Sequence, residues 1–137
     1  MTPLYAQDLD LSRYTVLAVD DVPLNLILIQ KMLAKFKFQV RTAGNGVQAL
    51  EAVAAQKPDL ILLDLMMPVM DGFEVIRRLR EAPATAGIRI VILSALNSNE
   101  DIVRGYQLGA NDFITKPIIL EKLLNCVATQ LQLAGRQ

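Results

Sequence analysis

Carboxylate, hydroxyl and ammonium side chains stand at the ends of four apolar runs in the sequence. They are Asp20, Asp21, Asp64, Ser94 and Lys116. Carboxylates that share one cleft repel one another and need a cation, and oxygen ligands without imidazole or thiolate suit Mg²⁺. A serine hydroxyl can donate a hydrogen bond to an anion, and a lysine ammonium can balance the charge of a phosphoryl group. These residue types would therefore suit magnesium-dependent phosphate chemistry, provided that the fold brings them together.

The apolar run before Asp64 indicates how the fold could do so. Residues 60–63 read Leu-Ile-Leu-Leu, which is typical of a strand buried on both faces in a parallel sheet. A charge inside such a strand would be costly, so Asp64 is expected at its carboxyl end. The carboxyl ends of parallel strands meet at one edge of the sheet, where ligands bind in open α/β folds. The five polar residues should then converge at that edge.

The rest of the chain alternates between strand and helix patterns. Strands are predicted at 14–19, 38–42, 59–64, 88–93 and 112–115, and helices at 24–36, 47–56, 73–81, 99–108 and 118–133. This alternation predicts an α/β fold, a doubly wound five-stranded parallel sheet flanked by five helices. We expect the stripe of Val22, Leu26, Ile29, Leu33 and Phe36 to face the core, and Val47, Leu50 and Ala54, with Val53 as a further candidate, to point inward from the next helix. Leu24, Ile27 and Leu28 fall on the opposite side of the first helix.

Composition narrows the class of protein. The 137 residues suit one domain, expected over residues 14–133 between an N-terminal arm at 1–13, with a helical turn considered around residues 8–11, and a tail at 134–137. Lys plus Arg and Asp plus Glu both number 14, which argues against a basic nucleic-acid-binding surface. No apolar stretch predicts a membrane span, so we expect a cytoplasmic protein. The chain has no histidine and only Cys126, which excludes histidine acid–base chemistry and an intrachain disulfide.

Each polar residue also has a simpler explanation when it is taken alone. Asp20 and Asp21 could cap the first helix, Asp64 could cap the helix that follows it or open a turn, and Ser94 could cap the fourth helix. Lys116 could be a solvated residue before a turn. The simple explanations become much less persuasive together, because one edge of the predicted sheet collects all five residues.

The motifs around these residues resemble the receiver domain of two-component response regulators. They are Asp20-Asp21, the strand Asp59–Asp64 with Met67-Pro68 and Met70-Asp71-Gly72 after it, Ser94-Ala95, and Gly109–Thr115 with Lys116-Pro117. The resemblance covers residues 15–131 and implies the flavodoxin-like, CheY-like fold with strand order 2-1-3-4-5.

The resemblance also implies a role for each residue of the site. Asp64 would be the phospho-acceptor. Asp21, Asp64 and the backbone carbonyl of Met66 would bind Mg²⁺ directly, with Asp20 acting partly through water. Ser94 and Lys116 would hold the phosphoryl oxygens, Ser94 and Phe113 would form the switch, and the Lys116–Pro117 peptide bond would be cis.

The expected partners follow from the same resemblance. The phosphoryl donor would be a sensor histidine kinase or a histidine phosphotransfer protein, docked in part on Leu24, Ile27 and Leu28. The face made by residues 99–108, 112–115 and 118–133 could be an output surface or form a homodimer. The apolar Met66 and Leu96 would flank the route of an attacking water and prolong the phosphorylated state. The chain could be a stand-alone receiver or a piece of a longer protein.

Three other functions fit parts of the sequence. A Mg²⁺-dependent phosphohydrolase of the haloacid dehalogenase type would have a second aspartate where this chain has Met66. A nucleotide-binding domain would have a G-x-G-x-x-G motif after the first strand, which is absent here. A degenerate receiver that serves only as an interaction module would not need the full set of Asp20, Asp21, Asp64, Ser94 and Lys116.

Overall fold

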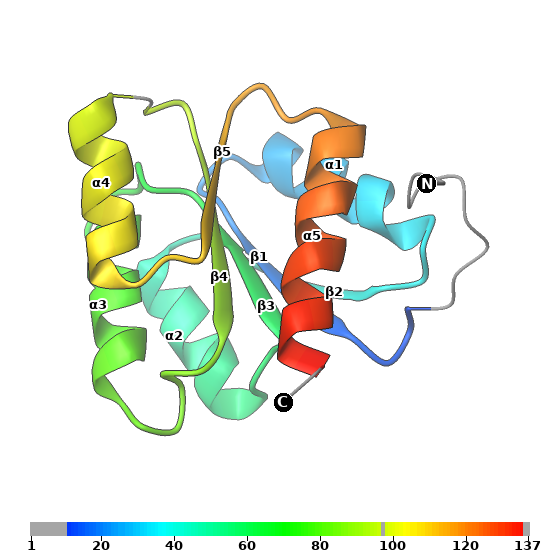
Figure 1. The fold of residues 1–137 in the computed structure, drawn as a ribbon, viewed down its shortest axis with the longest axis horizontal. Helices are drawn as coiled ribbons and strands as arrows, with labels where there is room; N and C mark the ends of the chain where they lie inside the picture. Colours follow the sequence, from blue (N-terminus) through cyan, green and yellow to red (C-terminus); the bar gives the residue numbers. More distant parts are fainter. Residues whose placement is uncertain (1–10, 97, 136–137) are drawn as a thin grey trace.

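A five-stranded parallel sheet with helices on both faces forms the molecule (Figure 1). A computed structural model describes residues 11–96 and 98–135. The elements in chain order are β1 (Thr15–Val19), α1 (Pro23–Ala34), β2 (Gln39–Ala43), α2 (Gly46–Ala55), β3 (Leu60–Leu63), α3 (Gly72–Glu81), β4 (Arg89–Ser94), α4 (Asn99–Leu108), β5 (Asp112–Thr115) and α5 (Leu120–Gly135). The strand order is β2-β1-β3-β4-β5, which confirms the predicted fold class and order. Residues 1–10, which hold most of the expected arm and of the turn considered near residue 8, lie outside the described part.

The central strands β1, β3 and β4 are buried on both faces because they carry apolar residues at most positions. Leu17, Ile61 and Ile90 face one core cluster, together with residues of α2 and α3. The alternate strand positions face a second cluster, which is closed by α1 and α5. Figure 1 shows the same division, with α1 and α5 on one face of the sheet and α2, α3 and α4 on the other. The unbroken apolar run at 60–63 is therefore explained by two cores.

Two details of the predicted helix faces are wrong. Val22 was expected in the core stripe of the first helix, but it is the extended N-cap residue of α1 and is 45% exposed. In α2 the buried positions are Gly46, Ala49 and Val53, whereas Val47 and Ala54 are exposed. The buried face of α2 begins at Gly46, which packs so closely against the loop after β3 that a Cβ there would lie 2.8 Å from the Met70 carbonyl oxygen. The predictions for Val53, which is buried, and for Leu50, which packs half-buried against the same core, are confirmed.

Among the residues that the structure describes, none of the helices is long and apolar enough to cross a membrane.

The strands all point the same way, so their carboxyl ends meet at one edge. The loops that leave this edge hold the predicted site.

Candidate functional site

Backbone hydrogen bonds continue past the ends of the strands and align the polar residues. The Asp20 N–H donates to the Ala43 carbonyl at 3.2 Å, and the Asp64 N–H donates to the Val19 carbonyl at 3.0 Å. On the other side of the sheet, the Lys116 N–H donates to the Ser94 carbonyl at 2.9 Å. Each residue is thus held in register with the neighbouring strand, and the convergence expected from the topology is observed.

Three carboxylates form the centre of this edge. One oxygen each from Asp20, Asp21 and Asp64 lies within 4.8 Å of the others. Asp20 and Asp64 are buried, at 2% and 6% exposure, while Asp21 is exposed. A buried pair of like charges is costly unless a cation or a proton offsets it. The donor set contains only oxygen, which fits a hard divalent cation such as Mg²⁺.

Lys116 offsets only part of the negative charge. Its Nζ lies 2.8 Å from Asp20 Oδ2 and 3.8 Å from Asp64 Oδ1. Asp20 also accepts from the Val22 N–H at 2.9 Å and from the Asn25 side chain at 3.1 Å, so its carboxylate is well satisfied. Asp64 makes the longer contact with the lysine and is the carboxylate with more capacity left to bind another group.

The pKa of Asp64 reflects this imbalance. Burial raises the pKa of this carboxyl above its usual range, and the negative charges of Asp20 and Asp21 raise it further. The Lys116 ammonium and the Met66 backbone N–H act in the opposite direction and do not fully offset the rise. A metal ion or a phosphoryl group with its cation would relieve the same cost.

The site residues are not the N-cap residues of the helices that follow them. The N-cap of α1 is Val22, which makes no side-chain cap bond. Asp71 caps α3 and Ser98 caps α4, each by accepting a hydrogen bond from a backbone N–H in the first turn. Asp64 and Ser94 therefore occupy the sheet edge without serving as caps of the helices that follow them.

Ser94 and Phe113, the two predicted switch residues, differ in burial and in the groups that they contact. Ser94 is fully buried, and its Oγ accepts a hydrogen bond from the Leu96 N–H at 3.1 Å. Phe113 is half-buried and lies beside α4, where a Cβ at Gly105 would be 3.8 Å from its ring. The two residues belong to adjacent strands, and Ser94 is paired with Thr115 in the sheet. The peptide bond between Lys116 and Pro117 is cis, as the resemblance implies.

Met66 and Leu96 lie in the loops that follow Asp64 and Ser94. Met66 is 57% exposed and Leu96 is half-buried. Both line an open pocket of about 510 Å³ that also contacts Asp101 and Arg104. None of the three carboxylates lines this pocket, so the predicted role of the two apolar side chains beside the site stays a prediction.

Sequence reasoning missed two residues that shape the site. A Cβ at Gly72 would lie 2.4 Å from the Asp64 carbonyl oxygen, so only glycine allows the loop after β3 to fold back so closely. The Gly72 N–H donates to the Leu65 carbonyl and fixes that turn. Asn25 was also missed, although it holds the Asp20 carboxylate. The Asp-Gly pair at 71–72 is a visible turn signal, whereas nothing in the spacing singled out Asn25.

The proposed docking residues of α1 are exposed, as the sequence predicts. Leu24 is 62% exposed, and Ile27 and Leu28 are each 45% exposed. Leu28 also lines a mostly apolar hollow of about 200 Å³ with Lys116, Pro117 and Ile118. This hollow joins the exposed face of α1 to the loop that carries the site lysine.

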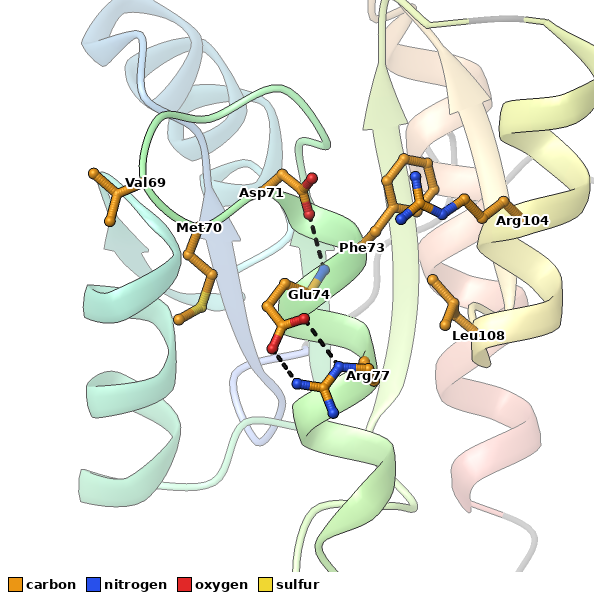
Figure 2. Close-up of a pocket in the computed structure, with 8 residues that line it drawn as sticks. All are labelled: Val69, Met70, Asp71, Phe73, Glu74, Arg77, Arg104 and Leu108. Carbon is orange, nitrogen blue, oxygen red and sulfur yellow. Dashed lines mark hydrogen bonds and ion pairs between the residues drawn. The ribbon is translucent and has the colours of Figure 1, made fainter.

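A further pocket lies between α3 and α4 and shares Asp71, Phe73 and Arg104 with the pocket that Met66 lines (Figure 2). The Arg104 guanidinium stacks over the Phe73 ring at 4.1 Å from its centroid, a contact that the sequence did not predict. Glu74 and Arg77 form an ion pair in the same pocket, and this pair lowers the pKa of Glu74 to about 2. Because its charged groups have local partners, this pocket is explained by the packing of the two helices.

Comparison with known proteins agrees with this architecture. The family model described as "Response regulator receiver domain" matches residues 16–128. The response regulator PleD of Caulobacter vibrioides is 45% identical over 103 residues, covering 75% of this chain and 23% of that protein. The DNA-binding response regulator MtrA of Mycolicibacterium smegmatis is 39% identical over 124 residues, covering 90% and 53%.

A solved structure gives the same result. The receiver domain of a histidine kinase from Syntrophus aciditrophicus has a TM-score of 0.84 and 32% identity, covering 90% of this chain and 94% of its own. This chain belongs to the response regulator receiver domain family. It spans only about a quarter to a half of these two full-length response regulators.

Proposed function

We propose that this chain is a phosphorylation-dependent signalling switch that accepts a phosphoryl group on Asp64. The donor is the phosphohistidine of a sensor histidine kinase or histidine phosphotransfer protein, because the chain itself has no histidine. The supporting observation is the cluster of three carboxylates within 4.8 Å, with Lys116 bridging Asp20 and Asp64. The chain catalyses only its own phosphorylation and dephosphorylation, in the cytoplasm, and needs no nucleic acid or membrane for either step.

Magnesium would be held by Asp21, Asp64 and the Met66 backbone carbonyl, with Asp20 acting partly through water. When bound, Mg²⁺ supplies positive charge that offsets the phosphoryl oxygens. The Asp64 carboxylate attacks phosphorus, and the bond from phosphorus to the donor imidazole nitrogen breaks, with its electron pair leaving on that nitrogen. Lys116 balances charge on the phosphoryl oxygens during transfer, and Ser94 donates a hydrogen bond to the acyl phosphate afterwards.

The switch would run from Ser94 to Phe113. Phosphorylation draws the Ser94 hydroxyl toward Asp64, which breaks its bond with the Leu96 N–H and frees space for the Phe113 ring. Because that ring lies beside Gly105, its rotation changes the face made by α4, β5 and α5, which serves as an output or homodimer surface. Unchanged NMR shifts at Phe113 with beryllofluoride and Mg²⁺ would rule out this coupling.

The flanking residues should favour a long-lived acyl phosphate. Met66 and Leu96 line one open pocket, and their apolar side chains offer no group that orients water. The double variant Met66→Asn, Leu96→Glu should lose its phosphoryl group faster. An unchanged dephosphorylation rate would refute the shielding role.

The partner would dock on α1. Leu24, Ile27 and Leu28 form an exposed apolar patch that reaches the hollow next to Lys116. Burial of such a patch at a charged rim is typical of protein interfaces. Leu28→Glu should slow transfer from the cognate phosphohistidine while acetyl phosphate still phosphorylates Asp64, and Val103→Glu on α4 is the matched control. Loss of both routes would instead assign Leu28 to the fold.

The deciding experiment is intact mass after incubation with acetyl phosphate and Mg²⁺. The wild type should gain one phosphoryl group, and omission of Mg²⁺ or the substitution Asp64→Asn should abolish the gain. A wild type that gains none, although its circular dichroism shows a folded chain, would leave the interaction-module function as the explanation.

A further inference from the structure

Met66 is the most exposed methionine in the described part of the chain. Its side chain is 57% exposed, whereas Met67 is 7% exposed and Met32 and Met70 are half-buried. An exposed thioether is open to two-electron oxidants, which convert it to a sulfoxide. Met66 also lies two residues after Asp64, its backbone N–H donates to the Asp64 carboxylate, and its side chain lines an open pocket together with Leu96. The most accessible thioether is thus located where a polar group would affect the chemistry of Asp64.

The single cysteine does not compete for the oxidant. Peroxides react with the thiolate, and the half-buried Cys126 is kept as a neutral thiol. Burial raises the pKa of the Cys126 thiol, and the Sγ donates a hydrogen bond to Asp112 at 3.1 Å, which favours the protonated form further. The reaction with a peroxide should therefore fall on Met66 before Cys126.

From this geometry we propose that Met66 is a redox modification site whose oxidation shortens the life of the phosphorylated state. A sulfur lone pair attacks one oxygen of a peroxide and the O–O bond breaks. The sulfur loses two electrons and gains that oxygen, and the other peroxide oxygen leaves as water after proton transfer. The side chain changes from an apolar shield into one with a strong hydrogen-bond acceptor.

The new S=O group would lie where an attacking water must pass. A sulfoxide oxygen can accept a hydrogen bond from that water and orient its lone pair toward phosphorus, which the thioether cannot do well. The wetter entrance also gives water easier access to the acyl phosphate. Both changes accelerate hydrolysis without touching the Asp64 carboxylate. This inference rests on the proposed phosphorylation of Asp64 and adds a chemical input to it.

The test compares the lifetime of the acyl phosphate before and after mild hydrogen peroxide. Peptide mass mapping should show one added oxygen on Met66 ahead of the other methionines and of Cys126. The half-life should fall about threefold to tenfold, the scale of one hydrogen bond. Treatment with methionine sulfoxide reductases should restore it. Met66→Gln should show a short half-life without peroxide.

Two variants serve as controls. Met66→Leu should have the same half-life before and after peroxide, whatever its starting value, and Met70→Leu should respond as the wild type does. The inference is overturned if Met66 is oxidised and the half-life stays the same, if Met66→Leu responds like the wild type, or if another sulfur is oxidised first. Absence of any phosphoryl adduct on the unoxidised protein would instead overturn the proposed function, and this inference with it.

Discussion

Polar side chains gather at both ends of the central sheet, but the hydrogen bonds of the arginines are balanced by neutral acceptors at one end, whereas the negative charges at the other end are only partly balanced. At the amino ends of the strands, Arg80 donates to the carbonyls of Gly109 and Ile88 and to the Asn111 side chain. Near it, Arg89 makes two hydrogen bonds to Gln130. At the carboxyl ends, three carboxylates share one lysine.

This difference indicates which of the two polar clusters stabilises the fold and which is the better candidate for a binding site. The arginine of the amino end is matched to neutral acceptors, so its bonds stabilise the fold. At the carboxyl end one lysine faces three carboxylates, and the negative charge that it does not offset is costly to bury. Such a cost is typical of a site that binds a cation and a phosphoryl group. Substitutions at the amino end should therefore lower the stability of the fold, whereas substitutions at the carboxyl end should change phosphorylation of Asp64.

The largest effect is expected for Lys116→Met. This change removes the cation that would balance the phosphoryl oxygens, so the rate of acyl phosphate formation should fall by about 10²–10³-fold. Intact mass against time, with acetyl phosphate and saturating Mg²⁺, measures the rate. A loss of less than threefold would show that Lys116 only balances Asp20 in the folded protein.

The sequence predicted the carboxyl end better than the amino end. Asp64, Ser94 and Lys116 stand at the carboxyl ends of neighbouring parallel strands, so the topology places them together. The contacts of Arg80 depend on where the loops around residues 86 and 109 lie, and no short-range pattern encodes that. The same limit explains the missed stacking of Arg104 on Phe73, which joins two helices.

Neither α1 nor α2 has sharply separated polar and apolar faces, so the sequence predicted the buried face of each helix only in part. Ile29 and Leu33 are buried as expected, because α1 must cover the sheet with one stripe. In α2 nearly every position is apolar, so periodicity could not choose a face. The close approach of Gly46 to Met70 decided it instead, and that contact joins distant segments.

An intermediate effect is expected for Arg80→Met at the balanced end. The change leaves buried carbonyl groups without a donor, so the free energy of unfolding should fall by roughly 2–4 kcal/mol. The rate of phosphorylation in the folded fraction should not change. Urea denaturation measures the first quantity and intact mass the second.

Arg78→Met, which removes only an exposed pair with Glu74, is the control and should cost less than about 1 kcal/mol. A slower phosphorylation rate in Arg80→Met would show that the two ends are coupled.

The smallest effect is expected for Asp64→Asn, which should raise the stability of the fold and not lower it. Burial and the neighbouring carboxylates disfavour the charge on Asp64, and the amide removes that charge while keeping the shape of the side chain. The free energy of unfolding without Mg²⁺ should therefore rise by roughly 0.5–2 kcal/mol, the gain seen when a strained functional group is relieved. Asp59→Asn, whose carboxylate accepts from the Thr15 N–H at 2.8 Å at the other end of the sheet, should show no such gain. Millimolar Mg²⁺ should raise the stability of the wild type and not that of Asp64→Asn, because the variant lacks one charged ligand. If Asp64→Asn is instead destabilised, the attraction of Lys116 outweighs burial and repulsion, and the carboxyl end is as well balanced as the amino end.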